Sequence, residues 1–250
     1  MNLKEKFEET EIKKDWIIEL LIFIISVIFI AFILALDIKW TLPTVNIELV
    51  NFPLNLFYSF IMFTVFVGTQ KLVAYARDCR HTLTFLGFRR YWFRPILEHG
   101  TAELPFNFPL WFVLPALLVL VNIKWLAILN FDLEPKPTHV RHRWSNITEE
   151  DVGRIAISGP LALMALGILM RIFGAADFAF LCFLFAFLVM IPIGIGFKIV
   201  MSSRILWFFS LVFSLVMLLL INLQTTFAII MTAVIFAALA TLAYYVLYEK

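Results

Sequence analysis

The feature that most constrains this chain is the almost purely apolar run from Trp16 to Leu36. As an α-helix it would cover about 30 Å, the thickness of the hydrocarbon core of a bilayer. The run is too long for a signal-peptide core and lacks a small-residue cleavage site, so it predicts an uncleaved anchor helix. Further apolar runs follow, and 62% of the residues are hydrophobic against 15% that are charged. A water-soluble fold could not bury this much apolar surface, and the sequence therefore predicts an integral membrane protein.

Six of the apolar runs are predicted to be membrane-spanning helices. The predicted spans are 16–36, 54–76, 152–173, 178–199, 205–223 and 227–248. Residues 1–15 are charged and are expected to form a short cytoplasmic N-terminal segment, and residues 16–249 a single polytopic membrane domain. The expected fold class is all-α integral membrane, with no soluble domain.

The region between the second and third spans departs from this pattern. The apolar run from Pro109 to Val121 has only about 13 residues and contains Pro115, whereas a spanning helix needs nearer 20. It is expected to be re-entrant or interfacial. Residues 125–133 alternate between apolar and polar and predict a short β-like stretch, while residues 37–51 are expected to form a short exposed loop.

The basic residues predict how the helices are oriented. If the Pro109 to Val121 run does not cross the membrane, most of the 20 basic residues fall on one side, as the positive-inside rule expects. Both termini are then cytoplasmic in a cell membrane. The arginines within 77–94 are expected at the membrane surface. Attraction to anionic lipid headgroups explains these basic residues without a nucleic-acid partner.

Several kinds of chemistry have little support in the sequence. The apolar runs carry almost no carboxylates or histidines, which ion-coupled and proton-coupled pumps need within the membrane. His139 and His142 have a spacing seen in metal sites, but Arg141 and Arg143 beside them oppose a bound cation. The sequence contains no Gly-rich phosphate loop and no Gly-x-Ser-x-Gly elbow. Thr148 with Asp151 predicts the N-terminal cap of the third span.

Two segments together carry a resemblance to a known family. Residues 147–162, which contain Gly159-Pro160, resemble the segment of archaeal site-2 proteases that leads into their Gly-Pro-x-x-Asn motif. Residues 191–199 resemble a shortened form of the Asn-x-x-Pro…Asp-Gly motif of the same family. Residues 71–87 are similar to the segment that follows the family's HExxH helix.

The catalytic residues of that family are absent at the matching positions. The resemblance places the equivalent of HExxH at residues 66–70, and neither His nor Glu occurs from 54 to 80. The position of the ligand Asp holds Ile195. The resemblance therefore implies a degenerate, catalytically inactive relative for which neither zinc nor another cofactor is expected. The remnant motif positions form a candidate binding cleft: Phe66, Gly68, Gln70, Gly159, Pro160, Pro192, Ile195 and Gly196.

Three functions follow as hypotheses. The first is a pseudoprotease that binds transmembrane segments of other proteins, with membrane lipids around it, or that scaffolds a complex. The second is a small transporter or channel-like component for an uncharged or lipidic solute, with a path lined by Thr64, Thr69, Gln70 and Ser158. The third is a lipid-modifying enzyme with His81 and His139 at the membrane interface. If the resemblance is due to chance, Gly159-Pro160 is only a kink that allows close helix packing.

Overall fold

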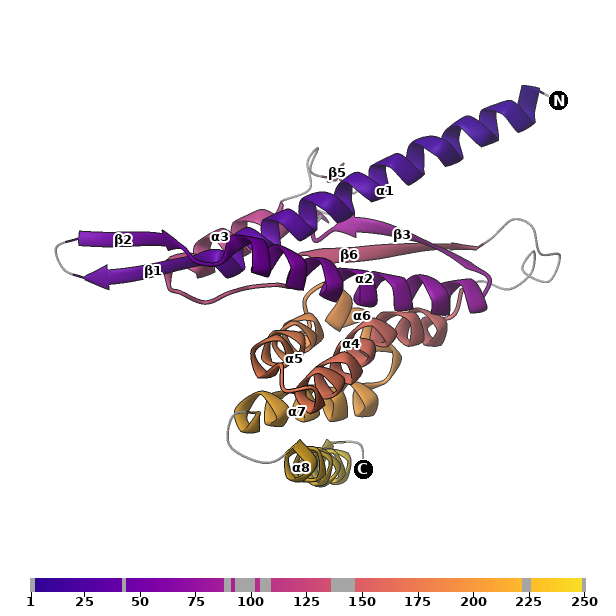
Figure 1. Cartoon of the computed structure of the whole chain (residues 1–250). Helices are drawn as coiled ribbons and strands as arrows, with labels where there is room; N and C mark the ends of the chain where they lie inside the picture. The colour runs from indigo at the N-terminus through magenta and orange to yellow at the C-terminus, as the bar shows by residue number, and fades with distance from the viewer. Residues whose placement is uncertain are drawn as a thin grey trace.

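The structure is a computed structural model of the whole chain, and it describes residues 3–41, 44–87, 91–92, 102–103, 109–135, 147–221 and 226–248. The described part is mostly helical (Figure 1). Its helices are α1 (Leu3–Ala35), α2 (Phe52–Ala76), α3 (Leu110–Leu120), α4 (Glu149–Ile172), α5 (Ala176–Met190), α6 (Ile195–Ser202), α7 (Arg204–Leu220) and α8 (Thr226–Tyr248). Its strands are β1 (Leu36–Thr41), β2 (Thr44–Leu49), β3 (Cys79–Phe85), β4 (Tyr91–Trp92), β5 (Ala102–Glu103) and β6 (Leu129–Pro135).

Within the described part of the chain, four helical stretches are long and apolar enough to cross a membrane: Trp16–Ala35, Phe52–Ala76, Glu149–Ile172 and Phe227–Val246. Large apolar side chains also cover much of the outside of the molecule. Phe57 is 59% exposed and Phe236 is 61% exposed, which is costly in water and favourable in lipid. The structure thus fits the predicted class of helical membrane protein. The count of six spans and their orientation stay predictions. Figure 1 shows α8 almost end-on, whereas α1 and α2 lie across the view.

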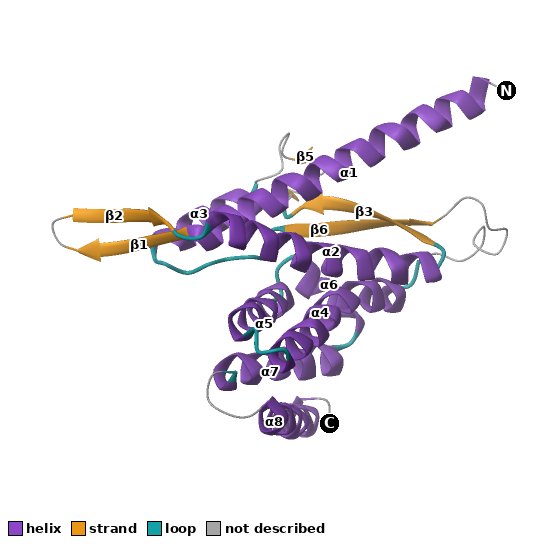
Figure 2. Cartoon of the chain, in the orientation of Figure 1, coloured by secondary structure: helices purple, strands orange, loops and turns teal. Residues whose placement is uncertain are grey.

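The N-terminal part differs from its prediction in two ways. Helix α1 begins at Leu3, so the charged residues that were expected to precede the first span form one continuous helix with it. Lys and Glu favour helix, and nothing in the sequence breaks it before the span. The loop predicted over 37–51 is instead mostly a hairpin, in which β1 and β2 pair antiparallel from Leu36 with Leu49 to Thr41 with Thr44. The hairpin extends beyond the ends of α1 and α2 (Figure 2).

Strands β3 and β6 form a second antiparallel pair, which lies against α1 and α2. Their register runs from Cys79 opposite Pro135 to Phe85 opposite Leu129. The β-like prediction for 125–133 is confirmed in part, because strand β6 begins at Leu129. Its partner β3 was predicted only as part of a surface segment. Helix α3 has 11 residues and covers about 16 Å, too short to cross a bilayer as one helix.

The apolar run over 178–199, which was predicted to be a span, is not one continuous helix. Helices α5 and α6 are separated by residues 191–194 and meet at an angle of 66°. Pro192 cannot donate an intrahelical hydrogen bond, and Gly194 has a φ of 66°, in the left-handed region that favours glycine. These two residues end α5 and redirect the chain into α6.

Helices α2, α4 and α5 surround the centre of the apolar core. Phe63 and Phe66 of α2 lie with their ring centroids 5.1 Å and 5.2 Å from that of Phe185 on α5. At one end of this core, Arg77 Nη1 lies 2.9 Å from Asp151 Oδ1 and joins the end of α2 to the start of α4. The Thr148 side chain accepts a hydrogen bond from the Asp151 backbone N–H at 3.2 Å, so the predicted helix cap is confirmed.

Candidate functional site

The structure brings three of the remnant motif positions into one contact between α2 and α4. A Cβ atom on Gly159 would lie 2.6 Å from the Phe66 ring and 3.1 Å from Gln70 Nε2. Gln70 also donates from Nε2 to the Ala156 carbonyl oxygen at 3.3 Å. Glycine at position 159 therefore leaves the space on α4 that the Phe66 side chain occupies.

This contact is closed and mostly apolar. Phe66 is fully buried, and Gln70 is 1% exposed with its amide bonded to α4. Pro160 is buried within α4, whereas Gly68 has open space where a side chain would be. Phe66 and Gln70, at positions that the resemblance assigns to HExxH, thus pack against α4, and a ligand-binding role for them stays a prediction.

The other three remnant positions lie at the bend between α5 and α6. Ile195 is 2% exposed, and a Cβ atom on Gly196 would lie 2.0 Å from the Ile191 carbonyl oxygen. Beyond the bend, a Cβ atom on Gly153 of α4 would lie 1.9 Å from the Ser202 Cβ of α6. The residues around the bend are therefore packed tightly against their own turn and against α4.

Lys198 connects α6 to the strand pair. Its Nζ donates to the Phe131 carbonyl oxygen, lies 4.1 Å from the centroid of the Phe131 ring, and is 4.0 Å from Asp132 Oδ1. A half-buried ammonium with these partners positions α6 against β6. Within the described ranges, no three His, Cys, Asp or Glu side chains are grouped so that they could hold a metal ion.

His81 of β3 is the one described histidine, and it is buried. Its ring stacks on Phe131 with a centroid distance of 4.9 Å, and neither ring nitrogen has a hydrogen-bond partner in the described part of the chain. Burial, and next the positive charge of Lys71, lower the pKa of His81 to about 4. The imidazole is therefore neutral at pH 7, and it is buried within the protein. His139, the other histidine of the lipid-enzyme hypothesis, lies outside the described residues.

Acid should destabilise the fold through His81. Because the folded state lowers the pKa of this group from 6.5 to about 4, stability is lost as the pH falls below 6.5 and continues to fall until about pH 4. Between pH 7 and pH 4.5 the loss should be about 2 to 3 kcal/mol. The measurement is unfolding in mixed detergent micelles at both pH values for the natural chain and for His81→Phe, which keeps a stacked ring. An equal loss in both proteins would assign the effect to other groups.

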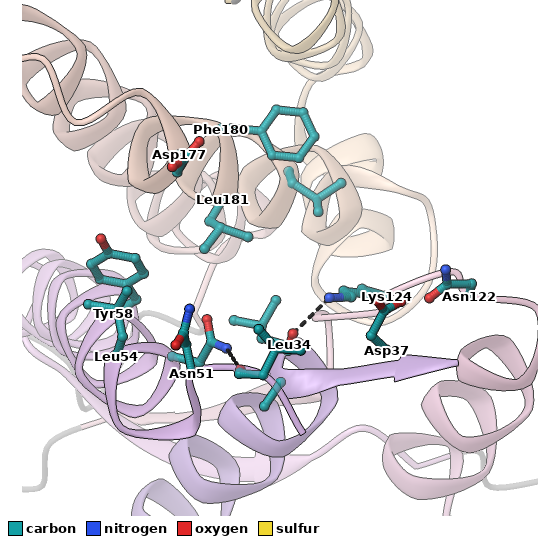
Figure 3. A pocket seen from close by; sticks show the side chains of 14 residues that line it. Leu34, Asp37, Asn51, Leu54, Tyr58, Asn122, Lys124, Asp177, Phe180 and Leu181 are labelled. Atoms are coloured by element: carbon teal, nitrogen blue, oxygen red, sulfur yellow. Dashed lines mark hydrogen bonds between the residues drawn. The ribbon is translucent and has the colours of Figure 1, made fainter. Parts of the chain in front are cut away.

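A polar pocket that the sequence did not predict lies where α1 ends and where α2 and α5 begin. It has a volume of about 720 Å³, and Figure 3 shows its side chains. Its polar lining is Asp37, Asn51, Asn55, Tyr58, Asn122, Lys124 and Asp177. The sequence indicates this pocket only through polar residues that stand directly before or after apolar runs. Tertiary packing decides which helix ends meet, and the sequence pattern does not reveal this.

A second, wholly apolar groove of about 410 Å³ lies between α1 and α2. Ile24 and Ile28 line it from α1, and Phe57 and Phe60 line it from α2. All four side chains are between 43% and 59% exposed. The groove therefore presents apolar side chains toward the surroundings of these two candidate spans.

Comparisons with protein-family models, with curated proteins and with solved structures find no match for this chain. The resemblance to site-2 proteases therefore stays a prediction from residues 147–162 and 191–199. What is shown is a helical, apolar chain compatible with a multi-pass membrane protein, in which a packed contact, a polar pocket and an apolar groove are the candidate sites.

Proposed function

We propose that this chain is a non-catalytic multi-pass protein of the cell membrane, with a scaffold like that of site-2 proteases, which binds transmembrane segments of other proteins or scaffolds a complex. The proposal includes six spans with both termini in the cytoplasm. The single observation that carries the non-catalytic part is the contact of Phe66 with Gly159. A phenyl ring fills the place where the resemblance implies metal-binding side chains, and apolar packing there supplies no ligand for zinc.

The apolar groove between α1 and α2 supports the binding part of the proposal. A membrane helix associates through van der Waals packing, which requires a surface with a matching depression. The groove offers such a depression on two adjacent candidate spans. We propose an apolar helix as the occupant of this groove.

The hydroxyl groups expected to line a transport path are used within their own helices. Thr64 donates to the Phe60 carbonyl oxygen at 2.7 Å, and Thr69 donates to that of Val65 at 2.8 Å. Ser158 donates to the Ile155 carbonyl oxygen at 2.8 Å. Side chains bonded in this way are poor contacts for a passing solute, and the arrangement favours binding over transport.

A photo-crosslinking amino acid in place of Phe57 should report the helix partner. The purified protein is placed in liposomes with a synthetic transmembrane peptide of about 20 apolar residues. Crosslinking to the peptide should be at least about five-fold stronger from position 57 than from position 236. This ratio is expected if the peptide binds at the groove about 1 kcal/mol more tightly than at α8. Phe236 is a matched control because it is also phenylalanine, is similarly exposed and lies on α8.

Equal crosslinking from the two positions would contradict the groove as a helix-binding site. The non-catalytic part has a separate test in the same preparation. Bound zinc is measured by elemental analysis, and cleavage of the peptide is followed by mass spectrometry. Zinc at one equivalent per chain, or cleavage that a chelator abolishes, would overturn it.

A further inference from the structure

The polar pocket lies at the ends of three apolar helices. Leu34 and Ala35 line it from the last turn of α1, Leu54 and Asn55 from the first turn of α2, and Leu181 from the start of α5. All three helices are strongly apolar, and α1 and α2 are candidate spans. The ends of such helices coincide with the boundary between hydrocarbon and headgroups.

Lys124 supplies a fixed positive charge to this pocket. Its Nζ donates to the Leu34 carbonyl oxygen at 2.7 Å, which holds the half-buried side chain at the C-terminal end of α1. An ammonium group has three N–H donors, so two of them can bind an anionic oxygen. The amide side chain of Asn122 lies on the same side of the pocket (Figure 3).

A carboxylate also lies on the opposite side of the pocket. Figure 3 shows Asp37 beside Lys124, and Asp177 and Tyr58 across the pocket from Lys124. Asp177 lies in the first turn of α5 and is exposed, so its carboxylate can accept hydrogen bonds from a cationic group. Asn55 donates from Nδ2 to the Val50 carbonyl oxygen at 3.0 Å, which leaves its side-chain oxygen as a further acceptor.

The remaining wall is apolar. Leu54 is 47% exposed and Phe180 is 36% exposed, and Leu184 continues this wall along α5. A ligand that fits the pocket therefore has one anionic group, one cationic group and a hydrocarbon part. A purely anionic headgroup fits less well, because the carboxylate of Asp177 lines the pocket together with the ammonium of Lys124.

We propose that this pocket binds a zwitterionic phospholipid with a primary ammonium in its headgroup. The phosphate lies at Lys124 and the ammonium lies at Asp177. The acyl chains extend along Leu54 and Phe180 toward the hydrocarbon. This lipid site is separate from the apolar groove and does not depend on the proposed function.

The test is native mass spectrometry of the purified protein with an equimolar mixture of phosphatidylethanolamine and phosphatidylglycerol that carry the same acyl chains. The natural chain should retain phosphatidylethanolamine about five-fold better, the ratio that one exposed ion pair of about 1 kcal/mol provides. Asp177→Asn should reduce this ratio to about one while phosphatidylglycerol binding is kept. Lys124→Gln should weaken the binding of both lipids. Equal binding of the two lipids by the natural chain, or a preference for phosphatidylglycerol, would overturn the proposal.

Two further variants separate binding from folding. Leu181→Trp fills the pocket without a change of charge and should weaken both lipids, and it tests the site even if Lys124→Gln does not fold. Lys71→Gln removes the same charge at an ion pair with Glu19, outside the pocket, and should bind like the natural chain. Natural binding by Leu181→Trp, or a loss in Lys71→Gln as large as in Lys124→Gln, would contradict the site. Displacement of the lipid by soluble glycerophosphoethanolamine at equal concentration would identify a soluble ligand and refute the lipid.

Discussion

Replacement of Gly196 by alanine should destabilise the protein by about 3 kcal/mol or more. The added Cβ would lie 2.0 Å from the Ile191 carbonyl oxygen and 2.7 Å from that of Met190. Both are backbone atoms at the bend between α5 and α6, so they cannot rotate away as a side chain could. The bend itself has to change. Unfolding by sodium dodecyl sulfate in mixed micelles, followed by tryptophan fluorescence, measures the free energy of unfolding.

Gly68→Ala is the matched control for this experiment. A Cβ at position 68 would have no side chain or neighbouring element of the described chain within 4 Å, and the residue lies in the interior of α2. Alanine is the better helix former, so this variant should be more stable than the natural chain by about 0.5 to 1 kcal/mol. If Gly196→Ala were as stable as Gly68→Ala, the backbone contact at the bend would not exist in the folded protein.

Gly159→Ala should cost about 2 kcal/mol, because the added Cβ would lie 2.6 Å from the Phe66 ring. Here the conflict is with a side chain, and a smaller residue at position 66 should relieve it. The double variant with Phe66→Leu should therefore be less destabilised than the sum of the two single variants, by about 1 to 2 kcal/mol. The same unfolding assay on all four proteins gives this coupling energy.

If the losses of stability in the two single variants simply added in the double variant, residues 159 and 66 would not be in contact. This result would contradict the packing of α2 against α4. The cycle also bears on the proposed function. Coupling between these two residues is expected if packing has taken the place of metal ligands. At Gly196 the added Cβ would contact backbone atoms, so no smaller side chain can relieve the conflict. Rescue by a second substitution is therefore expected for Gly159→Ala but not for Gly196→Ala.

Much of the helical framework could be predicted from the sequence, because it rests on local properties. The run from Trp16 onward is long and apolar enough to require a helix in lipid, whatever it packs against. The cap at Thr148 likewise depends on residues only three positions apart. Such features need no knowledge of the rest of the fold.

The features that were missed depend on contacts between distant segments or on a break within an apolar run. Hydrophobicity alone does not reveal the bend after Met190, because residues on both sides of it are equally apolar, and only Pro192 and Gly194 indicate it. Strand β3 pairs with a segment about 50 residues later, as Thr82 opposite Asp132 shows. The polar pocket combines four separate parts of the chain. Of the candidate site, the sequence predicted the contact partners Phe66, Gln70 and Gly159 only through the resemblance.

The register of β3 with β6 has a consequence for how this protein can vary. Because Phe85 is paired with Leu129, and the Leu86 backbone N–H donates to the Ile128 carbonyl oxygen at 2.9 Å, the chain leaves and re-enters the helical body at almost the same place. The described residues that lead back to this ladder are part of the core, because Trp125, Leu126 and Ile128 are buried there. A change of length just before β6 would therefore move buried side chains and Lys124 together, so the core and the polar pocket cannot vary independently of each other.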